Sequence, residues 1–351
     1  MAGPPRILIA GGSGVFGRLL AWELLTSTPA HVVLAGRDPQ RLAAACRGLG
    51  APARTEALLL DLQDARAVVR AAVGCFAVAC TAGPFQRLPA DLPRAAIEAG
   101  AHWLDIGDDG RWVLWLLADA HLDGIARDSG LSVMPGLSTV PALSGVLARW
   151  CRERLPGAHR ARVTLFIGNR NGKGAGAIAS ALGGGFSDPE PVDLPIGRRL
   201  AYRLCSPDAA LLREELGLDA EFRVAFELPL ASRAMAAAAA VACRLSPRGQ
   251  TALARGLSLL SAPLNHLGSR VSCLQVELWD ASGDRASACL VEAGQRLAVL
   301  PCALALEALL SGELRQRGLV RPAAWLAPEE WLARLQGREV EFMGRVESSL
   351  L

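Results

Sequence analysis

Short apolar runs alternate with segments of helical periodicity along the first 140 residues of the chain. Apolar runs of this length predict buried strands, and a repeat of three to four residues predicts amphipathic helices. The predicted strands are residues 6–10, 31–36, 56–60, 75–82, 102–106 and 131–134, and the predicted helices are residues 15–26, 39–49, 65–73, 92–99 and 111–129. Strands that alternate with helices in this way predict a parallel, doubly wound α/β sheet of the Rossmann type.

The pattern changes near residue 161, where the predicted strands become longer and their hydrophobic and polar residues alternate more regularly. We expect strands at residues 162–167, 221–228, 271–279 and 286–292, a hairpin loop at 280–284, helices at 297–311 and 328–336, and a last strand at 339–343. This predicts a second α/β domain with a mixed or partly antiparallel sheet. The alanine-rich residues 234–242 are expected to be a helix or strand packed in a core.

The expected domains are a dinucleotide-binding domain at residues 1–150, a substrate or dimerisation domain at 151–296, and a C-terminal segment at 297–351. For the last segment, packing against the first domain is one option. A length of 351 residues suits two domains, and 51% hydrophobic with 20% charged residues suits a globular protein. We expect a small-molecule partner and leave a homodimer open.

The net charge and the cysteine content indicate which binding partners and which cellular compartment to expect. A net charge of +3 without a basic cluster argues against nucleic acid. The nine cysteines are scattered, with no C-x-x-C pair and no zinc spacing, so we expect no metal site and a cytoplasmic protein with reduced thiols. The N-terminus does not read as a signal peptide. Residues 129–148, the longest uncharged run, contain prolines and glycine, which argues against a membrane-spanning helix and leaves peripheral lipid contact open.

The glycine-rich turn after the first predicted strand is the clearest chemical motif. Gly11, Gly14 and Gly17 have the spacing G-x-x-G-x-x-G between a strand and a helix. Such glycines allow a tight turn, close approach of a pyrophosphate, and close packing of helix on strand, while the helix N-terminus attracts the phosphates. The predicted cofactor-binding residues of this turn are Gly11, Gly12, Ser13, Gly14, Val15, Phe16 and Gly17. S-adenosylmethionine is the main alternative ligand for such a turn.

The end of the second predicted strand favours NADP over NAD. An acidic residue there holds the ribose 2′-hydroxyl of NAD, whereas this strand ends in Gly36 and Arg37, with Arg41 one helical turn later. A guanidinium matches a 2′-phosphate in charge and geometry. Asp38 is expected to cap the next helix, before Pro39. Asp61 is a further expected contact on the adenine side, with an ordinary loop role as its alternative.

Several segments together resemble the saccharopine dehydrogenase/reductase-like superfamily. They are residues 11–17, 32–38, 81–85, 98–105 and 134–136, and more thinly residues 318–324 and 339–342. The resemblance covers most of residues 6–145 and little of 160–295. It implies a nicotinamide-dependent reductase with its substrate between the two domains. That superfamily also contains polyamine-forming enzymes, enoyl reductases acting on lipid chains, and uncharacterised proteins.

The resemblance also implies roles for residues that follow the fourth and fifth predicted strands. Thr81, Gly83, Pro84 and Phe85 would line the nicotinamide side. Asp105 would face the cleft at the carboxyl end of its strand, where open α/β sheets bind ligands, so it is the expected catalytic acid. Its alternative role is to cap the loop at Gly107.

The glycine-rich segment 168–176 of the second domain is an expected substrate-binding loop. It contains Arg170 and the only lysine, Lys173, ahead of a predicted helix, so an anionic or carbonyl group of the substrate is expected there. A mobile surface loop is the alternative. A P-loop is excluded because Gly174 follows Lys173.

The sequence thus predicts a reductase that transfers hydride from NADPH to an imine, enamine or activated alkene of a hydrophobic substrate. Short-chain dehydrogenase chemistry is excluded, because it needs Tyr-x-x-x-Lys and the only tyrosine, Tyr202, is followed by Ser206. A non-catalytic NADP-binding sensor or a lipid- or complex-associated scaffold is the alternative from another class. Methyl transfer is the third.

Overall fold

The chain divides into two compact units in a computed structural model, which describes residues 3–172, 178, 182, 185–261 and 266–348. The first unit comprises Met1–Ser138 and Ala298–Trp325, and the second comprises Thr139–Leu297 and Leu326–Leu351. The first stretch of unit 1 ends before residue 150 because helix α7 (Ser144–Arg154) packs on strands of unit 2. The expected C-terminal segment 297–351 is shared between the units, because residues 298–325 belong to unit 1 and residues 326–351 to unit 2.

Unit 1 is built on a seven-stranded parallel sheet, here called sheet A. Its strands are β1 (Arg6–Ala10), β2 (His31–Gly36), β3 (Thr55–Leu59), β4 (Ala77–Cys80), β5 (His102–Asp105), β6 (Ser132–Met134) and β13 (Gly318–Leu319). Their order is β13-β6-β5-β4-β1-β2-β3. Apart from the added β13, this is the Rossmann order, and the chain reverses its direction of winding between β1 and β4. The six expected strands and the Rossmann architecture are confirmed.

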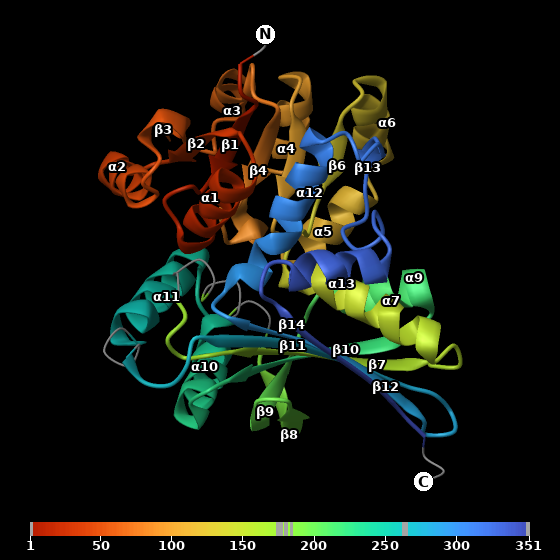
Figure 1. Ribbon diagram of the computed structural model, residues 1–351. Helices are drawn as coiled ribbons and strands as arrows, with labels where there is room; N and C mark the ends of the chain where they lie inside the picture. Colours follow the sequence, from red (N-terminus) through yellow and green to blue (C-terminus); the bar gives the residue numbers. More distant parts are fainter. Residues whose placement is uncertain (1–2, 173–177, 179–181, 183–184, 262–265, 349–351) are drawn as a thin grey trace. The chain divides into compact units, whose positions relative to one another are not determined.

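Helices cover both faces of sheet A (Figure 1). They are α1 (Val15–Ser27), α2 (Pro39–Gly48), α3 (Ala65–Ala72), α4 (Leu92–Glu98), α5 (Gly110–Leu117), α6 (Ala120–Asp128) and α12 (Leu300–Leu310). Helix α1 packs against α12 on one face, and α3 packs against α4 on the other. The single helix expected at 111–129 is wrong, because Asp119 accepts a hydrogen bond from the N–H of Leu122 and starts a new helix, α6.

Unit 2 contains a seven-stranded mixed sheet, here called sheet B. Its strands are β7 (Arg160–Ile167), β8 (Ser187–Leu194), β9 (Gly197–Leu204), β10 (Asp219–Phe226), β11 (Val271–Trp279), β12 (Arg285–Ala293) and β14 (Glu341–Glu347). Their order is β14-β12-β11-β7-β10-β9-β8, and only β7 and β10 pair in parallel. The expected mixed sheet is confirmed, and Asp280 closes the expected β11–β12 hairpin by accepting hydrogen bonds from Ser282 and Asp284.

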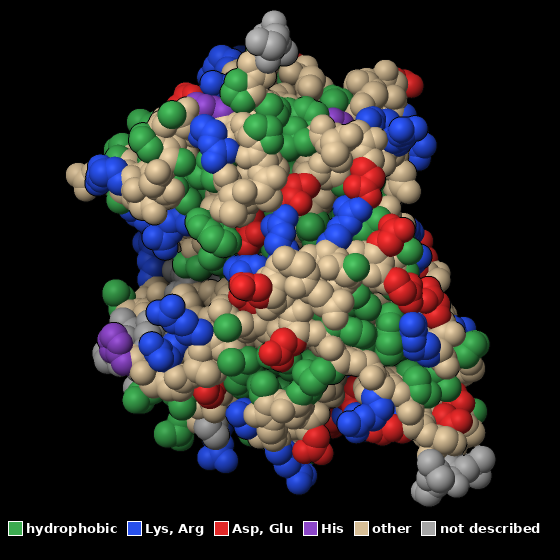
Figure 2. Space-filling model, in the orientation of Figure 1, with side chains coloured by type: hydrophobic (Ala, Val, Ile, Leu, Met, Phe, Trp, Pro, Cys, Tyr) green, Lys and Arg blue, Asp and Glu red, His purple; other side chains and the backbone are tan. Residues whose placement is uncertain are grey.

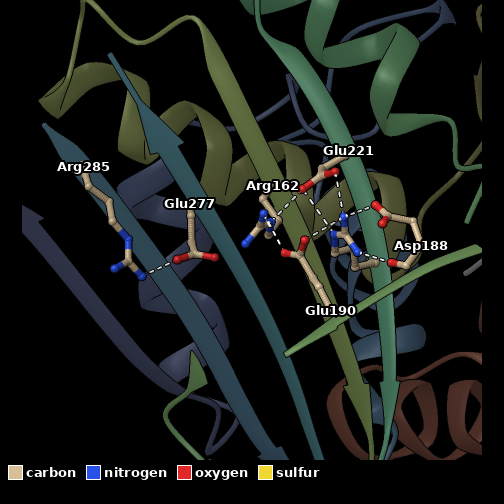
Figure 3. A network of polar contacts seen from close by, with 7 residues as sticks. Arg162, Asp188, Glu190, Glu221, Glu277 and Arg285 are labelled. Atoms are coloured by element: carbon tan, nitrogen blue, oxygen red, sulfur yellow. Dashed lines mark hydrogen bonds and ion pairs between the residues drawn. The ribbon is translucent and has the colours of Figure 1, made fainter. Parts of the chain in front are cut away.

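Helices α7, α9 (Asp208–Leu216) and α13 (Pro328–Gln336) pack over one face of sheet B. The opposite face carries charged residues in register across neighbouring strands. Figure 3 shows Arg162 on β7 between Glu190 and Glu221, and Glu277 on β11 paired with Arg285. Arg223 on β10 is only 2% exposed and contacts Asp188, Glu190 and Glu221, so its buried charge is compensated by three carboxylates.

The hydrophobic pattern missed the hairpin of β8 and β9. Strand β8 contains Pro189 and Pro191, which are tolerated because β8 lies at the sheet edge, where one side of the strand needs no N–H donors. The alanine-rich stretch forms part of α10 (Pro229–Ala242), which is followed by α11 (Pro247–Ser261). Only one side of α10 lies in a core, so the expected burial of that stretch holds for Ala239 and Ala242 and in part for Met235 and Ala238. Within the described residues, no helix combines the length and apolar character needed to cross a membrane.

Candidate functional site

The glycine-rich turn joins β1 to α1 at the point where the winding of sheet A reverses. Gly11 has φ +84°, and a Cβ there would lie 2.9 Å from the Cα of Ala82. A Cβ on Gly12 would lie 2.8 Å from Leu34, and one on Gly17 would lie 2.4 Å from the carbonyl oxygen of Gly11. The turn therefore requires glycine for its left-handed conformation and for close contact with β2, the residues after β4, and α1.

The N-terminus of α1 is open. Helix α1 begins at Val15 after Gly14, no side chain caps it, and its first turn contains no acidic residue. Gly12 and Gly17 are buried, whereas Ser13, Gly14, Val15 and Phe16 are partly exposed. The positive end of the helix dipole and its unsatisfied N–H groups thus face outward from a backbone cradle. These features fit the pyrophosphate of a dinucleotide.

The end of β2 places a basic side chain where the sequence predicts one. Arg37 and Arg41 are exposed, and neither forms an ion pair with any described residue. The carboxylate of Asp38 accepts hydrogen bonds from the N–H groups of Gln40 and Arg41, both at 3.0 Å, so it caps α2 as expected. The hydroxyl of Ser13 lies 3.7 Å from where a Cβ on Gly36 would be, which brings Ser13 to the same strand end.

Asp61 follows β3 on the surface and organises a turn. Its carboxylate accepts a hydrogen bond from the N–H of Gln63 at 3.1 Å, and its carbonyl accepts one from the N–H of Asp64 at 3.2 Å. Both interactions belong to the ordinary loop role that was its alternative. An adenine contact by Asp61 stays a prediction.

The residues after β4 lie beside the glycine-rich turn. Thr81 donates to the carbonyl of Ala10 from its N–H at 2.8 Å and from its hydroxyl at 3.0 Å, which ties the ends of β4 and β1 together. Gly83 is exposed, and Pro84, joined to it by a cis peptide bond, is partly exposed. Phe85 is buried, with its ring centroid 5.7 Å from that of Trp112. Gly83 and Pro84 therefore form the accessible part of this segment, and Phe85 supports it from within.

Asp105 lies at the end of β5 with no exposed surface. Its Oδ1 accepts hydrogen bonds from the N–H groups of Gly107 and Gly136, at 2.8 and 3.0 Å. Its Oδ2 accepts from the indole N–H groups of Trp103 and Trp112, at 2.9 and 3.0 Å. Burial raises the pKa of Asp105, and the four hydrogen bonds oppose that rise. All four neighbours are obligate donors, so they match an ionised carboxylate.

This network changes the interpretation of Asp105. The carboxylate joins β5, the loop after it, α5 and the residues after β6, and each oxygen already accepts two hydrogen bonds. The loop-capping alternative at Gly107 is observed, together with three partners that the sequence did not indicate. Trp103 could have been found, because an indole N–H group needs an acceptor when buried and Asp105 is the nearest acid to it in the sequence. Trp112 gave no such signal, because Asp108 and Asp109 are nearer to it in the sequence than Asp105 is. A catalytic role for Asp105 stays a prediction without support from these contacts.

Two thiols also lie in this part of unit 1. Burial raises the pKa of Cys80, on β4, to about 12, and the charge of Asp105 contributes to the rise. Burial raises the pKa of Cys302, on α12, as well, with Asp105 and Cys80 as further causes. Both thiols are therefore neutral near pH 7, which does not suit a nucleophile.

In unit 2, hydrogen bonds hold the first residues of the expected substrate-binding loop. The N–H of Asn169 donates to Glu227 at 2.8 Å, and the side chain of Asn171 donates to the hydroxyl of Ser272 at 3.3 Å. Arg170 is exposed, and its N–H donates to the carbonyl of Ser269. Lys173 lies outside the described residues. Substrate binding by Arg170 stays a prediction.

Comparisons with known proteins identify the fold. No family model and no curated protein matches the chain. The apo saccharopine dehydrogenase (L-Glu forming) from Saccharomyces cerevisiae matches over 99% of this chain and 100% of its own, with a TM-score of 0.67 and 13% identity. The 3-ketoreductase KijD10 from Actinomadura kijaniata, in complex with NADP, covers 89% of this chain and 91% of its own, with a TM-score of 0.44 and 14% identity.

A metagenomic short-chain oxidoreductase in complex with NADP matches over 38% of this chain and 82% of its own, with a TM-score of 0.29 and 21% identity. The likeness to saccharopine dehydrogenase extends over both units. At 13% identity it is a likeness of fold. It confirms, at that level, the resemblance that the sequence motifs indicate.

Proposed function

We propose that this protein is an oxidoreductase that binds a nicotinamide dinucleotide and prefers NADPH to NADH. The observation that carries the proposal is the glycine cradle of Gly11, Gly12 and Gly17 in front of the uncapped N-terminus of α1, at the reversal point of sheet A. Ligands of open α/β sheets bind at this point, outside the carboxyl ends of the strands. The cradle and the open helix end together offer a pyrophosphate both close backbone approach and unsatisfied N–H donors.

Arg37 and Arg41 support NADPH as the preferred form. Arg37 directly follows β2, Arg41 lies in the first turn of α2, and both side chains are exposed. Asp38, between them, is occupied in capping α2, and Ser13 lies at the end of β2. A 2′-phosphate would therefore meet two cations and a hydroxyl. The ribose of NADH would lack the acidic partner that usually holds it.

The proposed reaction is hydride transfer to an imine, an enamine or an activated alkene of a hydrophobic substrate. A bound NADPH would supply the hydride, and the residues of the chain would orient it, with Gly83 and Pro84 along the nicotinamide side. Since all four hydrogen bonds of Asp105 are made within unit 1, we propose water as the source of the proton. All nine cysteines are free thiols, which supports a location in the cytoplasm.

Titration of the purified protein with NADPH and NADH, followed by nucleotide fluorescence, tests the cofactor. We expect Arg37→Gln to weaken NADPH binding about ten- to a hundredfold, the value of a charge-assisted contact to phosphate, and to leave NADH binding unchanged. Arg47→Gln is the matched control, because Arg47 is exposed in the last turn of α2, the helix that follows Arg37. The proposal fails if neither nucleotide binds, and the preference for NADPH fails if NADH binds more tightly.

The enclosure of Asp105 favours a second candidate function, an NADP-binding sensor or scaffold without catalysis. The acid expected to deliver a proton is buried and fully hydrogen-bonded. A panel of cyclic imines, enamines and enoyl thioesters, with NADPH oxidation followed by absorbance of the reduced nicotinamide, separates the two. Oxidation with any member supports the reductase, and tight NADPH binding without oxidation across the panel supports the sensor.

A further inference from the structure

A long acid-free segment of unit 2 carries five arginines. No aspartate or glutamate occurs between Glu227 and Glu277, although the chain has 34 acidic residues among 351. The arginines of this segment are Arg233, Arg244, Arg248, Arg255 and Arg270, and all five are exposed. Helices α10 and α11 make up most of the segment, so a surface of one charge sign is concentrated on a helical pair.

Helix α10 places apolar and basic side chains on the same outward face. Leu230 is 77% exposed, and Val241 is also exposed, as are Arg233 and Arg244. These positions recur at intervals of three, eight and three residues, which keeps them on one side of a helix. The other side, with Ala239 and Ala242, packs in a core with α11. The exposed leucine and valine are therefore not needed to hold the helix pair together.

Helix α11 repeats this arrangement. Arg248 and Arg255 are seven residues apart on its outward face, and Leu259 and Leu260 at its end are each 76% exposed. Leu267, beyond the helix, is exposed as well. Half of the twelve large hydrophobic side chains that stand exposed in the described chain belong to residues 230–267. Figure 2 shows blue basic side chains beside green hydrophobic ones where α11 lies in Figure 1.

The arginines of this segment differ from those on sheet B. Arg162 and Arg223 are paired with carboxylates on neighbouring strands. By contrast, none of the five arginines of the acid-free segment forms an ion pair with a described residue. Exposed leucines beside uncompensated guanidinium groups are a combination that suits the boundary between lipid headgroups and acyl chains.

We propose that the exposed residues of α10, α11 and positions 266–270, here called the α10–α11 surface, bind an anionic lipid bilayer. The leucines and Val241 enter the acyl boundary, and the arginines contact lipid phosphates, so binding is peripheral and reversible. Charge complementarity favours this partner over a second copy of the chain, because a twofold contact would bring like charges together. The absence of aromatic residues between Glu227 and Glu277 disfavours single-stranded nucleic acid.

Co-sedimentation of the full-length protein with lipid vesicles tests the proposal without cofactor or substrate, so the outcome is independent of the proposed oxidoreductase function. The vesicles are phosphatidylcholine alone, or phosphatidylcholine with about 30% phosphatidylglycerol to supply a negative surface potential. We expect binding to the anionic vesicles only, and its loss at about 1 M salt, where the screening length falls to about 3 Å.

Two double variants separate the charged and apolar contributions. Arg248→Gln with Arg255→Gln is expected to weaken partitioning about 25-fold, since each arginine near an anionic surface contributes about fivefold. Leu259→Ser with Leu260→Ser is expected to weaken it at least about tenfold, from lost burial of two partly inserted side chains. Leu59→Ser with Val73→Ser is the control, because these two side chains are exposed in unit 1 and outside the surface.

Circular dichroism checks that each variant keeps its fold, which is expected because the four substituted side chains are exposed. Three results would overturn the proposal. They are no binding to anionic vesicles, equal binding of wild type and both variants, and a wild-type dimer in solution that the leucine variant converts to a monomer. The last result would assign the surface to a second copy of the chain.

Discussion

Substituting Asp105 by asparagine distinguishes a structural carboxylate from a catalytic one. Oδ1 accepts two backbone N–H groups and Oδ2 accepts two indole N–H groups. In Asp105→Asn, one of the two oxygens becomes an NH₂ group. Whichever way the amide is oriented, it places a donor against two donors, so either the pair from Gly107 and Gly136 or the pair from Trp103 and Trp112 loses its acceptor.

The expected loss of stability follows from this count. Each buried donor left without an acceptor costs about 1–3 kcal/mol. The variant also removes a buried charge, whose desolvation is the reason that the pKa of Asp105 is raised, and this offsets part of the loss. We therefore expect the free energy of unfolding of unit 1 to fall by about 2–4 kcal/mol, toward the lower end of the range for breaking a buried charged network.

Urea unfolding followed by near-ultraviolet circular dichroism measures this change, because two of the affected groups are indoles. Asp109→Asn is the matched control. Asp109 accepts one hydrogen bond, from the N–H of Trp112, as the N-cap of α5, and asparagine caps a helix equally well. The reasoning is refuted if Asp105→Asn unfolds within about 0.5 kcal/mol of wild type, the range of an ordinary surface substitution. Wild-type stability with lost turnover would instead restore Asp105 as the catalytic acid.

Three further predictions concern stability. His102 accepts a hydrogen bond from the N–H of Ser132, and burial lowers the pKa of His102 to about 4. Since the unfolded chain binds the proton more readily, we expect unit 1 to lose about 3 kcal/mol of unfolding free energy as pH falls from about 6.5 to 4. In urea unfolding, His102→Gln is expected to abolish this pH dependence. Gly17→Ala places a Cβ against the backbone of Gly11 and Gly12, so it is expected to lower the melting temperature and to weaken NADPH binding. Gly48→Ala, in open space on α2, is the control and is expected to be neutral or slightly stabilising. Equal melting temperatures of the two variants would contradict the packing. Arg223→Met removes the ion pair of Asp188 and leaves Glu190 and Glu221 with Arg162 alone, so we expect unit 2 to lose about 1.5–3 kcal/mol in denaturant unfolding, the value of hydrogen bonds between charged groups. A loss below about 0.5 kcal/mol would contradict the network.

The sequence predicts unit 1 well because most of its strands, with the edge strand β3 as an exception, are buried on both faces and therefore form continuous apolar runs in the sequence. The glycine-rich turn could be found from the sequence because its backbone leaves little choice of residue. Gly11 has φ +84°, and a Cβ on Gly11 or Gly17 would approach a neighbour to under 3 Å. Strand β8 was missed because edge strands need neither hydrophobic alternation nor every N–H group. Strand β13 was missed because two residues carry no periodicity.

The sequence predicted the places of Asp38 and Asp105 in the fold, and the partners of only one of them. Asp38 is the helix cap that Pro39 suggests, because a cap depends on neighbours in sequence. Asp105 was placed at the correct strand end, but its partners include Trp112 and Gly136, which lie on separate elements. A carboxylate that is catalytic and one that is buried as a structural acceptor have the same local sequence, and only the long-range donors distinguish them.

The contacts around the reversal point of sheet A bear on the proposed preference for NADPH. Gly11 packs against the residues after β4, Thr81 ties β4 to β1, and Asp105 ties β5 to the residues after β6. The strand ends that would hold a pyrophosphate and nicotinamide are thus fixed by contacts within unit 1. Arg37 stands outside these contacts, exposed and without an ion pair among the described residues. A substitution there changes the charge presented to the ribose while leaving the cradle intact, so nucleotide preference and fold are expected to vary independently at this position.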